Sequence, residues 1–437
     1  MVYIGPPVTT SYDILSRVAL ETALQQVPGY AAWRSRDPGP TTAIDQRYAA
    51  LPILTKQELR DHFPYGFIRP GRDLHEGLAA GEVEYAKTSG STDDQVTLVF
   101  HPPWWEASER GAWQLNATAR RVTTGSHREV VLASPRCVGP GYAEHPQPRA
   151  QRTLGRHLYI NEKINPATWT GEDVRRMADE LNAYEPVVLE ADPAYLAAFA
   201  RRLHEARVPV HQPALIFLTY SFPSRIYRRL IRTVFQPPMA SSYGSTETGH
   251  VFMECEAGRL HQNTGHCRID FEPWRADYGG PTLGRMLVSV FDNPWCAVLR
   301  FDIGDVAHRD ERGPCPCGRT GGLTLASIDG RLKDVTFAPG GRAVTVDHLD
   351  AALAGVPGLC GWQLDAVAPG DYRLRVLAEN GAADRVEREA QAALEPVYGA
   401  GARLVVKAGD ALEHETSGKF RLARTHYAVD HTVLWRS

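Results

Sequence analysis

The chain has 437 residues, of which 43% are hydrophobic and 23% charged. This composition is typical of soluble globular proteins, and the length suffices for two or three domains. A net charge of −3, from 48 basic and 51 acidic residues, excludes the broad basic surface that nucleic acids or anionic membranes require. No apolar run reaches the roughly 18 residues of a membrane span, and the N-terminus lacks the pattern of a signal peptide. We therefore expect a cytoplasmic protein without nucleic-acid or membrane partners, and leave a homodimer open.

The first part of the chain predicts an α/β fold. Residues 1–80 combine helical patterns, such as Ile14–Gln26, with proline-rich connectors and read as a helical lead-in. Short apolar runs then alternate with amphipathic stretches up to about Ile328. The runs expected to form strands are Glu129–Ser134, Pro186–Ala191, Ala214–Thr219 and Arg285–Asp292. Tyr195, Leu196, Phe199 and Leu203 recur at helical spacing between two of these runs, which indicates a sheet core flanked by helices.

The pattern changes after Gly330. The order there is β-α-β-β-α-β, the split βαβ pattern of a small ferredoxin-like α+β domain. Its expected elements are a strand at 334–338, a helix at 346–356, strands at 361–367 and 372–378, a helix at 384–398 and a strand at 402–408. The sequence thus predicts a large N-terminal domain, 1–330, and a small C-terminal domain, 334–437, with a junction near Arg331–Asp334.

Five polar segments carry the chemistry. The first is "TSGST" at Thr88–Thr92, which on its own is either a phosphate-binding loop or an ordinary polar turn. The other four are Ser242–Gly249 "SYGSTETG", Arg300–Asp305 "RFDIGD", Gly330–Lys333 "GRLK" and Thr416–Arg421 "TSGKFR". A solvated loop is the alternative for each segment, but their joint occurrence favours a nucleotide site assembled from several strand ends.

The segment at 242–249 has the groups that a nucleotide needs. Tyr243 offers an aromatic face to a base, and Gly244 allows close approach of the backbone. Thr246 supplies a hydroxyl to a phosphate, and Glu247 can hold Mg²⁺ against phosphate oxygens.

Three further side chains complete the predicted site. Asp305 follows a glycine turn and can accept both hydroxyls of a ribose. Arg331 could reach the same ribose or a phosphate. Lys419, between a glycine and a phenylalanine, could place a mobile positive charge on an oxygen where negative charge develops.

The seven cysteines are an odd number in a long chain, which argues against a disulfide framework. Cys315 and Cys317 flank one proline, and five residues separate Cys255 from His261. Three thiolates and an imidazole form a closed tetrahedral set typical of structural zinc. Alternative ligands are Cys267, Cys296 and His266. The remaining two cysteines, Cys137 and Cys360, read as core residues.

The order "TSGST … YGSTE … GD … GRLK … SGK" resembles the adenylate-forming superfamily of acyl-CoA synthetases, peptide-synthetase adenylation domains and luciferases. The lead-in "LPILTKQELRDHFP", the compact length and "CPCGRT" are similar to its phenylacetate-CoA ligase branch, where the "EC…H" and "CPCGR" segments also stand. The resemblance implies a large multi-sheet domain that binds ATP and a carboxylic acid, and a small domain that rotates about a hinge. The implied zinc would fasten the loop after "YGSTE" to the segment following Asp305.

The resemblance also implies roles for single residues. The matching positions are Ser89, Gly90, Ser91 and Thr92 for the phosphate loop; Tyr243, Gly244, Thr246 and Glu247 for adenine and Mg²⁺; Asp305 for ribose; Arg331 before the hinge; Lys333 at the hinge; and Lys419 as the lysine of the adenylation half-reaction.

The activity so implied is activation of a carboxylic acid by Mg·ATP, through an acyl-adenylate, followed by transfer of the acyl group. We expect an aryl or arylacetyl acid and coenzyme A as the acceptor. An amine or a carrier-protein thiol is the alternative acceptor. A zinc-stapled binding protein that holds nucleotide or acyl-adenylate without turnover is the alternative of another class, although it would not need both Glu247 and Lys419.

Three departures from the family pattern concern ligand binding. Asp93 to Val96, "DDQV", stand where the family has a glycine and a proline-lysine pair, which predicts a weaker grip on the β- and γ-phosphates. Thr219 to Pro223, "TYSFP", replace a glycine-alanine-glutamate segment and remove its carboxylate. Ile303 replaces a threonine. The residues considered for the acyl pocket, with ordinary core and loop positions as the alternative, are Cys137, Tyr142, His145, Tyr220 and Phe222.

Overall fold

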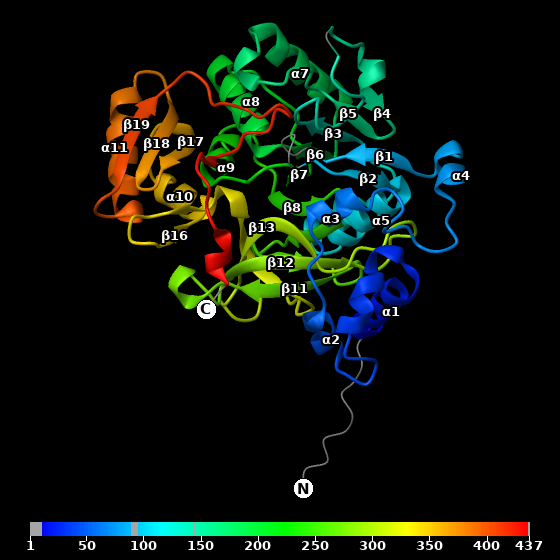
Figure 1. The fold of residues 1–437 in the computed structure, drawn as a ribbon. Coiled ribbons are helices and arrows are strands. Elements are labelled where there is room, and N and C mark those ends of the chain that lie inside the picture. Colours follow the sequence, from blue (N-terminus) through cyan, green and yellow to red (C-terminus); the bar gives the residue numbers. More distant parts are fainter. Residues whose placement is uncertain (1–10, 89–94, 144, 436–437) are drawn as a thin grey trace.

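A lead-in of short helices opens the chain in the computed structural model, which describes residues 11–88, 95–143 and 145–435 (Figure 1). Its helices are α1 (Ser11–Gln26), η1 (Pro28–Arg36), α2 (Ile44–Ala50), α3 (Lys56–Asp61) and α4 (Leu74–Ala79). These helices lie within residues 1–80, where the sequence predicts a helical lead-in. Helix α1 buries Ala19, Leu20, Ala23 and Leu24 in a core shared with strands of the large sheet. Among the described residues, no helix has the length and apolar character that a membrane span requires.

The centre of the molecule is a twelve-stranded sheet with the order β11-β12-β13-β14-β10-β9-β8-β7-β6-β3-β5-β4. Its strands are β3 (Glu129–Leu132), β4 (Thr153–Leu154), β5 (His157–Tyr159), β6 (Val188–Ala191), β7 (Leu215–Leu218), β8 (Met239–Ser245), β9 (Gly249–Glu254), β10 (Leu260–Gln262), β11 (Cys267–Pro273), β12 (Leu283–Val290), β13 (Phe301–Arg309) and β14 (Thr324–Arg331). Strands β1 (Glu84–Lys87) and β2 (Thr97–Phe100) form a separate antiparallel pair.

One half of this sheet is parallel, since β5, β3, β6, β7 and β8 run in one direction. The helices of this region are α5 (Pro102–Trp113), α6 (Ala117–Val122), α7 (Gly171–Tyr184), α8 (Pro193–Ala206) and α9 (Arg225–Ile231). A side chain caps the start of each of them, including Thr170 for α7, Asp192 for α8 and Ser224 for α9. Because the strands are parallel, the segments that follow β3, β6 and β7 gather at one sheet edge, where ligands bind in open α/β sheets.

A second sheet in the last part of the chain has the order β19-β18-β17-β20. Its strands are β17 (Leu359–Ala368), β18 (Asp371–Ala378), β19 (Arg403–Ala408) and β20 (Ala423–Thr425), with helices α10 (Val346–Leu353) and α11 (Ala383–Tyr398). The predicted small α+β unit is thus confirmed, but the expected strand at 334–338 does not join its sheet. That segment forms β15 (Thr336–Phe337), which pairs with β16 (Ala343–Val344), and β20 takes the edge position beside β17.

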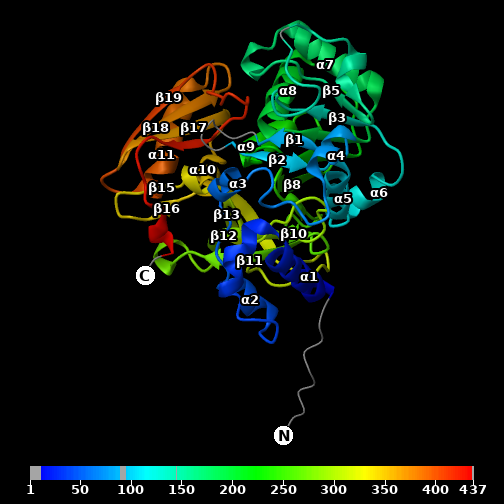
Figure 2. The same ribbon diagram turned by 45° about the vertical axis from the view of Figure 1, so that its right-hand side comes forward.

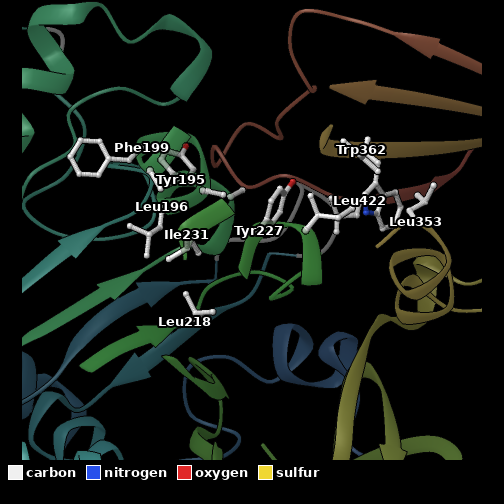
Figure 3. Packing of buried hydrophobic residues seen from close by; sticks show 14 of the residues in the cluster. Tyr195, Leu196, Phe199, Leu218, Tyr227, Ile231, Leu353, Trp362 and Leu422 are labelled. Carbon is white, nitrogen blue, oxygen red and sulfur yellow. The ribbon is translucent and has the colours of Figure 1, made fainter. Parts of the chain in front are cut away.

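The two sheets are joined through α9, which packs against β17 and α10 (Figures 1 and 2). Figure 3 shows Tyr227 of α9 extending toward Leu422, with Trp362 of β17 close by. Polar contacts surround this apolar contact: the Arg225 guanidinium donates to Asp347 at 2.7 Å, and Ser224 hydrogen-bonds to the buried Asp350. The remaining 3₁₀ helices are η2 (Arg149–Arg152), η3 (Pro166–Thr168), η4 (Ala276–Tyr278), η5 (Leu332–Asp334) and η6 (His431–Leu434).

Candidate active site

Tyr243, Asp305 and Arg331, which are far apart in the sequence, meet across β8, β13 and β14. The Tyr243 hydroxyl donates to Asp305 Oδ2 at 2.7 Å, and Arg331 Nε lies 3.8 Å from Asp305 Oδ1. Burial raises the pKa of Tyr243 well above its usual value, and the Asp305 carboxylate adds to the shift, so the hydroxyl remains a donor. The three side chains that sequence analysis assigned to adenine, ribose and the hinge side of the nucleotide therefore form one constellation.

The turn between β8 and β9 holds the other residues of the "YGSTE" segment. Thr246 is half-buried and Glu247 is buried, and the turn is closed by the Thr248 amide, which donates to the Ser245 carbonyl at 3.0 Å. A Cβ at Gly244 would lie 2.1 Å from the Gly249 carbonyl oxygen. Gly244 is therefore required by the close approach of β9 itself, and not only by the approach to a ligand that sequence analysis assigned to it.

The predicted phosphate loop, Ser89, Gly90, Ser91 and Thr92, lies outside the described residues together with Asp93 and Asp94. Its two flanks are bonded to each other: the Thr88 amide donates to the Val96 carbonyl, and the Val96 amide donates to Thr88 Oγ1, each at 2.9 Å. The Val96 side chain is buried in the core, with only 1% of its surface exposed. The position that we compared with the family's loop lysine is thus an interior position, which explains why it carries valine.

Lys419 lies in the long segment between β19 and β20, which reaches from the small sheet toward α8 and the end of β3 (Figure 1). Burial raises the pKa values of Asp192 and Cys137, and the Lys419 charge opposes both shifts, which places this lysine near them. Cys137 was predicted to be a core residue, and that is wrong. It is half-buried, and its Sγ lies 3.2 Å from the Ser417 carbonyl oxygen.

The Lys419 segment also contacts the predicted hinge. Arg421 Nη2 donates to the Lys333 carbonyl at 3.3 Å, and its Nε bonds to the Asp334 carboxylate. Burial would lower the pKa of Arg331, but the negative charges of Asp305, Asp334 and Glu415 raise it. Since Glu415 belongs to the Lys419 segment, that segment lies beside the Tyr243–Asp305–Arg331 constellation.

The Glu190 carboxylate lies next to Thr219–Pro223, the segment that lacks the carboxylate of the family pattern. Tyr220, at the end of β7, adopts φ +71° and hydrogen-bonds through its hydroxyl to Glu190 of the neighbouring strand β6. Burial raises the pKa values of both groups. The glutamate absent from Thr219–Pro223 thus has a counterpart on an adjacent strand, which a pattern along one segment could not reveal.

Glu129 of β3 is the centre of a buried charge network. His127 Nε2 and Arg156 Nε lie 2.5 and 2.7 Å from its Oε1. Burial alone would raise its pKa, but the hydrogen bonds from His127 and His157 and the charge of Arg156 lower it to about 2. Because the carboxylate has no surface exposed to water, its ionised form depends on these partners.

We expect Glu129→Gln to lower the free energy of unfolding at pH 7.5 by roughly 3 kcal/mol, because a buried ion network would lose its central charge. A lowered pKa stabilises the fold above the unfolded value of about 4.5, so this difference should shrink as the pH falls toward 2. Urea unfolding at pH 7.5 and 3.5 measures both effects. Glu106→Gln, at an exposed i,i+4 pair with Arg110, is the control and should change the stability by less than about 0.5 kcal/mol.

Of the residues considered for the acyl pocket, His145 lines a cavity, whereas Tyr142 and Phe222 do not line it. His145 lines a small cavity of about 20 Å³, room for about one water molecule, together with Val131, Tyr159 and Arg152. Tyr142 does not line it: the residue is 45% exposed, and its ring centroid lies 5.2 Å from the Arg136 guanidinium carbon. Phe222 packs at the edge of the main hydrophobic cluster. An open aromatic slot is thus not formed by these residues in this conformation.

His250, the second residue of β9, lies directly behind the "YGSTE" turn and was not predicted from the sequence. Its ring packs edge-on against Trp105 of α5 at 4.7 Å, and its Nδ1 lies 3.2 Å from Ser242 Oγ. Burial lowers its pKa to about 3, so the imidazole is neutral at physiological pH. A single histidine after a glycine gave no signal in the sequence.

The four predicted zinc ligands converge. The ligand atoms of Cys255, His261, Cys315 and Cys317 all lie within 4.8 Å of one another. Tetrahedral zinc would separate two sulfurs by about 3.8 Å and a sulfur from an imidazole nitrogen by about 3.5 Å. The separations are 3.7 Å between Cys255 and Cys315 Sγ, and 3.3 Å between Cys317 Sγ and His261 Nε2. The residues present therefore fit a closed zinc site.

The surroundings of this cluster orient His261, and two of the three alternative ligands, His266 and Cys267, have hydrogen-bond partners elsewhere. Thr324 Oγ1 lies 3.4 Å from His261 Nδ1, which leaves Nε2 for a metal. His266 Nε2 is instead bonded to the Thr248 carbonyl, and Cys267 Sγ to the Asn263 carbonyl. The cluster joins the β9–β10 hairpin to the loop between β13 and β14, close to the strand that carries Asp305.

No protein-family model matches the chain, and no curated protein matches it. Solved structures do. 2-Hydroxyisobutyryl-CoA ligase in its postadenylation state with 2-HIB-AMP has a TM-score of 0.69 at 15% identity, over 94% of this chain and 88% of that one. The same enzyme in its thioesterification state with 2-HIB-AMP and CoA has a TM-score of 0.53 at 16% identity, over the same shares. The anthranilate CoA ligase AuaEII with anthranoyl-AMP gives 0.52 at 11% identity, over 77% and 65%. The chain therefore has the fold of adenylate-forming acyl-CoA ligases.

Proposed function

We propose that the chain is an ATP-dependent ligase that activates a carboxylic acid as an acyl-adenylate and transfers the acyl group to coenzyme A. The observation that carries this proposal is the convergence of Tyr243, Asp305 and Arg331 beside the segment that bears Lys419. A base, a ribose and a phosphate each find a suitable group there. The segment that bears Lys419 comes to that place from the C-terminal part of the chain, which a simple nucleotide-binding protein would not require.

The reaction has two steps. The substrate carboxylate attacks the α-phosphorus of ATP, the bond to the bridging oxygen breaks, and pyrophosphate leaves. The thiolate of coenzyme A then attacks the acyl carbonyl, and AMP leaves with the bonding electrons while the thiol proton passes to solvent. Asp305 would hold the ribose, and the phosphates would lie by Thr246 and the Ser89–Thr92 loop. Glu247 would hold Mg²⁺, which would neutralise phosphate charge. Lys419 would stabilise the negative charge that develops in the first step.

Two orientations of the small C-terminal part, with Lys333 at the hinge, would let one site serve both steps. The better structural match to the postadenylation state than to the thioesterification state of the same enzyme supports the view that the present orientation serves the first step. The junction at 331–334 and the domains 1–330 and 334–437 belong to this proposal.

The substrate class is an aryl or arylacetyl acid, as in the phenylacetate-CoA ligase-like branch that "LPILTKQELRDHFP" and "CPCGRT" resemble. The Glu190–Tyr220 pair would give an acyl pocket beside it a polar wall, in keeping with a ring that carries a hydroxyl or amino group.

The test is pyrophosphate release from ATP with a panel of acids: phenylacetate, benzoate, ring-substituted hydroxy- and aminobenzoates, and 2-hydroxyisobutyrate. The product mass with coenzyme A, amines or a carrier protein as acceptor then identifies the nucleophile. A thioester of coenzyme A is expected. An amide or a carrier-bound product would show that the acceptor is an amine or a carrier-protein thiol and not coenzyme A. The absence of acid-dependent pyrophosphate release from metal-replete protein would overturn the ligase assignment.

Within this proposal, Asp305→Asn should raise the Michaelis constant for ATP roughly tenfold or more, because a hydrogen bond to a charged acceptor is lost. Steady-state kinetics at saturating acid measure the change. Asp277→Asn, an exposed aspartate in η4, serves as the control. An unchanged constant in the Asp305 variant would remove this residue from the nucleotide site.

A further inference from the structure

The Lys419 loop is a self-closed turn that presents its carbonyl oxygens outward. The Glu415 amide donates to the Lys419 carbonyl at 2.9 Å, and the Gly418 amide donates to the Glu415 carbonyl at 2.8 Å. Gly418 adopts φ +85°, a conformation that favours glycine. The backbone of the loop thus has a defined shape, and the carbonyl groups of Thr416, Ser417 and Gly418 are left for outside donors.

Each of these three successive carbonyls accepts a hydrogen bond from a side chain of the large-sheet part of the molecule. Arg136 Nη1 donates to the Thr416 carbonyl at 2.9 Å. Ser134 Oγ donates to the Ser417 carbonyl at 2.6 Å. The Tyr195 hydroxyl donates to the Gly418 carbonyl at 3.0 Å. We propose that Ser134, Arg136 and Tyr195 are positioning residues that dock the Lys419 loop for the adenylation half-reaction; this rests on the proposed function.

The fit of the loop in this docking site is tight. A Cβ at Gly418 would lie 2.3 Å from Ser134 Oγ and 2.8 Å from the Tyr195 hydroxyl, closer than any real contact. Ser134 follows β3 with 2% of its surface exposed, and Tyr195 in α8 is fully buried, so neither can move aside. The docking site therefore accepts only a glycine directly before the lysine.

The docking site also keeps hydrogen-bond partners for its own side chains when the Lys419 loop leaves it. The Tyr195 hydroxyl lies between the carbonyls of Gly418 and Ile164, so it keeps an acceptor when the loop departs. Ser134 Oγ remains bonded to the Arg136 amide at 3.3 Å. Because the buried Tyr195 hydroxyl is not left without an acceptor, undocking avoids a large desolvation penalty. This is what a loop must do if it serves the first half-reaction and withdraws for the second.

The first experiment measures docking without any substrate. Trypsin cleavage after Lys419 is followed in the full-length chain, together with cleavage at other sites. Ser134→Ala and Tyr195→Phe should accelerate cleavage after Lys419 by about threefold to tenfold, and Gly418→Ala by more. Tyr184→Phe removes a tyrosine hydroxyl that donates to the Arg156 carbonyl at 2.9 Å away from the loop, and it should leave this rate unchanged. Equal rates in all variants would overturn the docking proposal, whatever the activity of the protein.

The second experiment separates the half-reactions with the best acid of the panel above. Acid-dependent exchange of pyrophosphate into ATP should fall about threefold to tenfold in Ser134→Ala and in Tyr195→Phe, and at least a hundredfold in Gly418→Ala. Transfer from a supplied acyl-adenylate should stay within about twofold of the unmodified chain. A general structural defect would lower both rates equally, and that result would contradict a positioning role.

Discussion

Lys419→Ala should reduce acyl-adenylate formation by at least about a hundredfold, while transfer from a supplied acyl-adenylate changes by no more than about threefold. The reason is that the ammonium group stabilises charge only while the carboxylate attacks the α-phosphate, and its removal leaves that charge without a preorganised partner. The loop that carries it is docked against Ser134 and Tyr195 in the present orientation. Pyrophosphate release and single-turnover transfer measure the two rates.

The matched control is Lys407→Ala, which removes an exposed lysine of β19 that pairs with Glu387 at 3.5 Å. It should leave both rates unchanged. If Lys419→Ala instead slows both half-reactions to the same extent, one fixed arrangement serves both steps, and the two-orientation mechanism is wrong.

Cys317→Ala should remove the bound zinc and lower the free energy of unfolding by at least about 3 kcal/mol, with a fall of several degrees in the melting temperature. The loss of stability should be large because the four ligands come from two segments that are distant in the sequence. Cys255 and His261 flank the β9–β10 turn, and Cys315 and Cys317 come from the loop between β13 and β14. Burial raises the pKa of the Cys255 thiol to about 12, so a metal must displace its proton to form this site.

Metal analysis of the purified protein checks the first part of this prediction, with about one equivalent of zinc expected in the unmodified chain and almost none in Cys317→Ala. Cys360→Ala, at a buried thiol outside the cluster, should retain the zinc. Zinc bound to both variants alike would show that these residues are not the ligands.

The parallel half of the large sheet could be predicted closely, because its strands are short, apolar and buried on both faces. Residues 186–191 and 214–219 show this, since they contain β6 and β7 with no more than two extra residues at either end. The convergence of Cys255, His261, Cys315 and Cys317 could also be predicted, since four such ligands in two pairs suit one tetrahedral ion. In both cases the local pattern and the final structure follow from the same physical requirement.

What could not be predicted depends on contacts between distant segments. Strand β20 is three residues long and gains its place only by pairing with β17, while the longer apolar run near Phe337 is taken up by β16. Glu190 comes beside Tyr220 because their strands are neighbours, and Ser134 meets Ser417 across more than 280 residues of chain. No periodicity along the sequence encodes such pairs, so hydroxyls and carboxylates at strand ends remain ambiguous until the sheet order is known.

The most direct measurement of acyl-adenylate formation is acid-dependent exchange of labelled pyrophosphate into ATP, in metal-replete protein and without any acceptor. Exchange should appear with at least one aryl or arylacetyl acid, require Mg²⁺, and be lost in Lys419→Ala but not in Lys407→Ala. Exchange that is absent with every acid of the panel, or that persists undiminished in Lys419→Ala, would contradict the assignment of this chain as an adenylate-forming ligase that works through its C-terminal lysine.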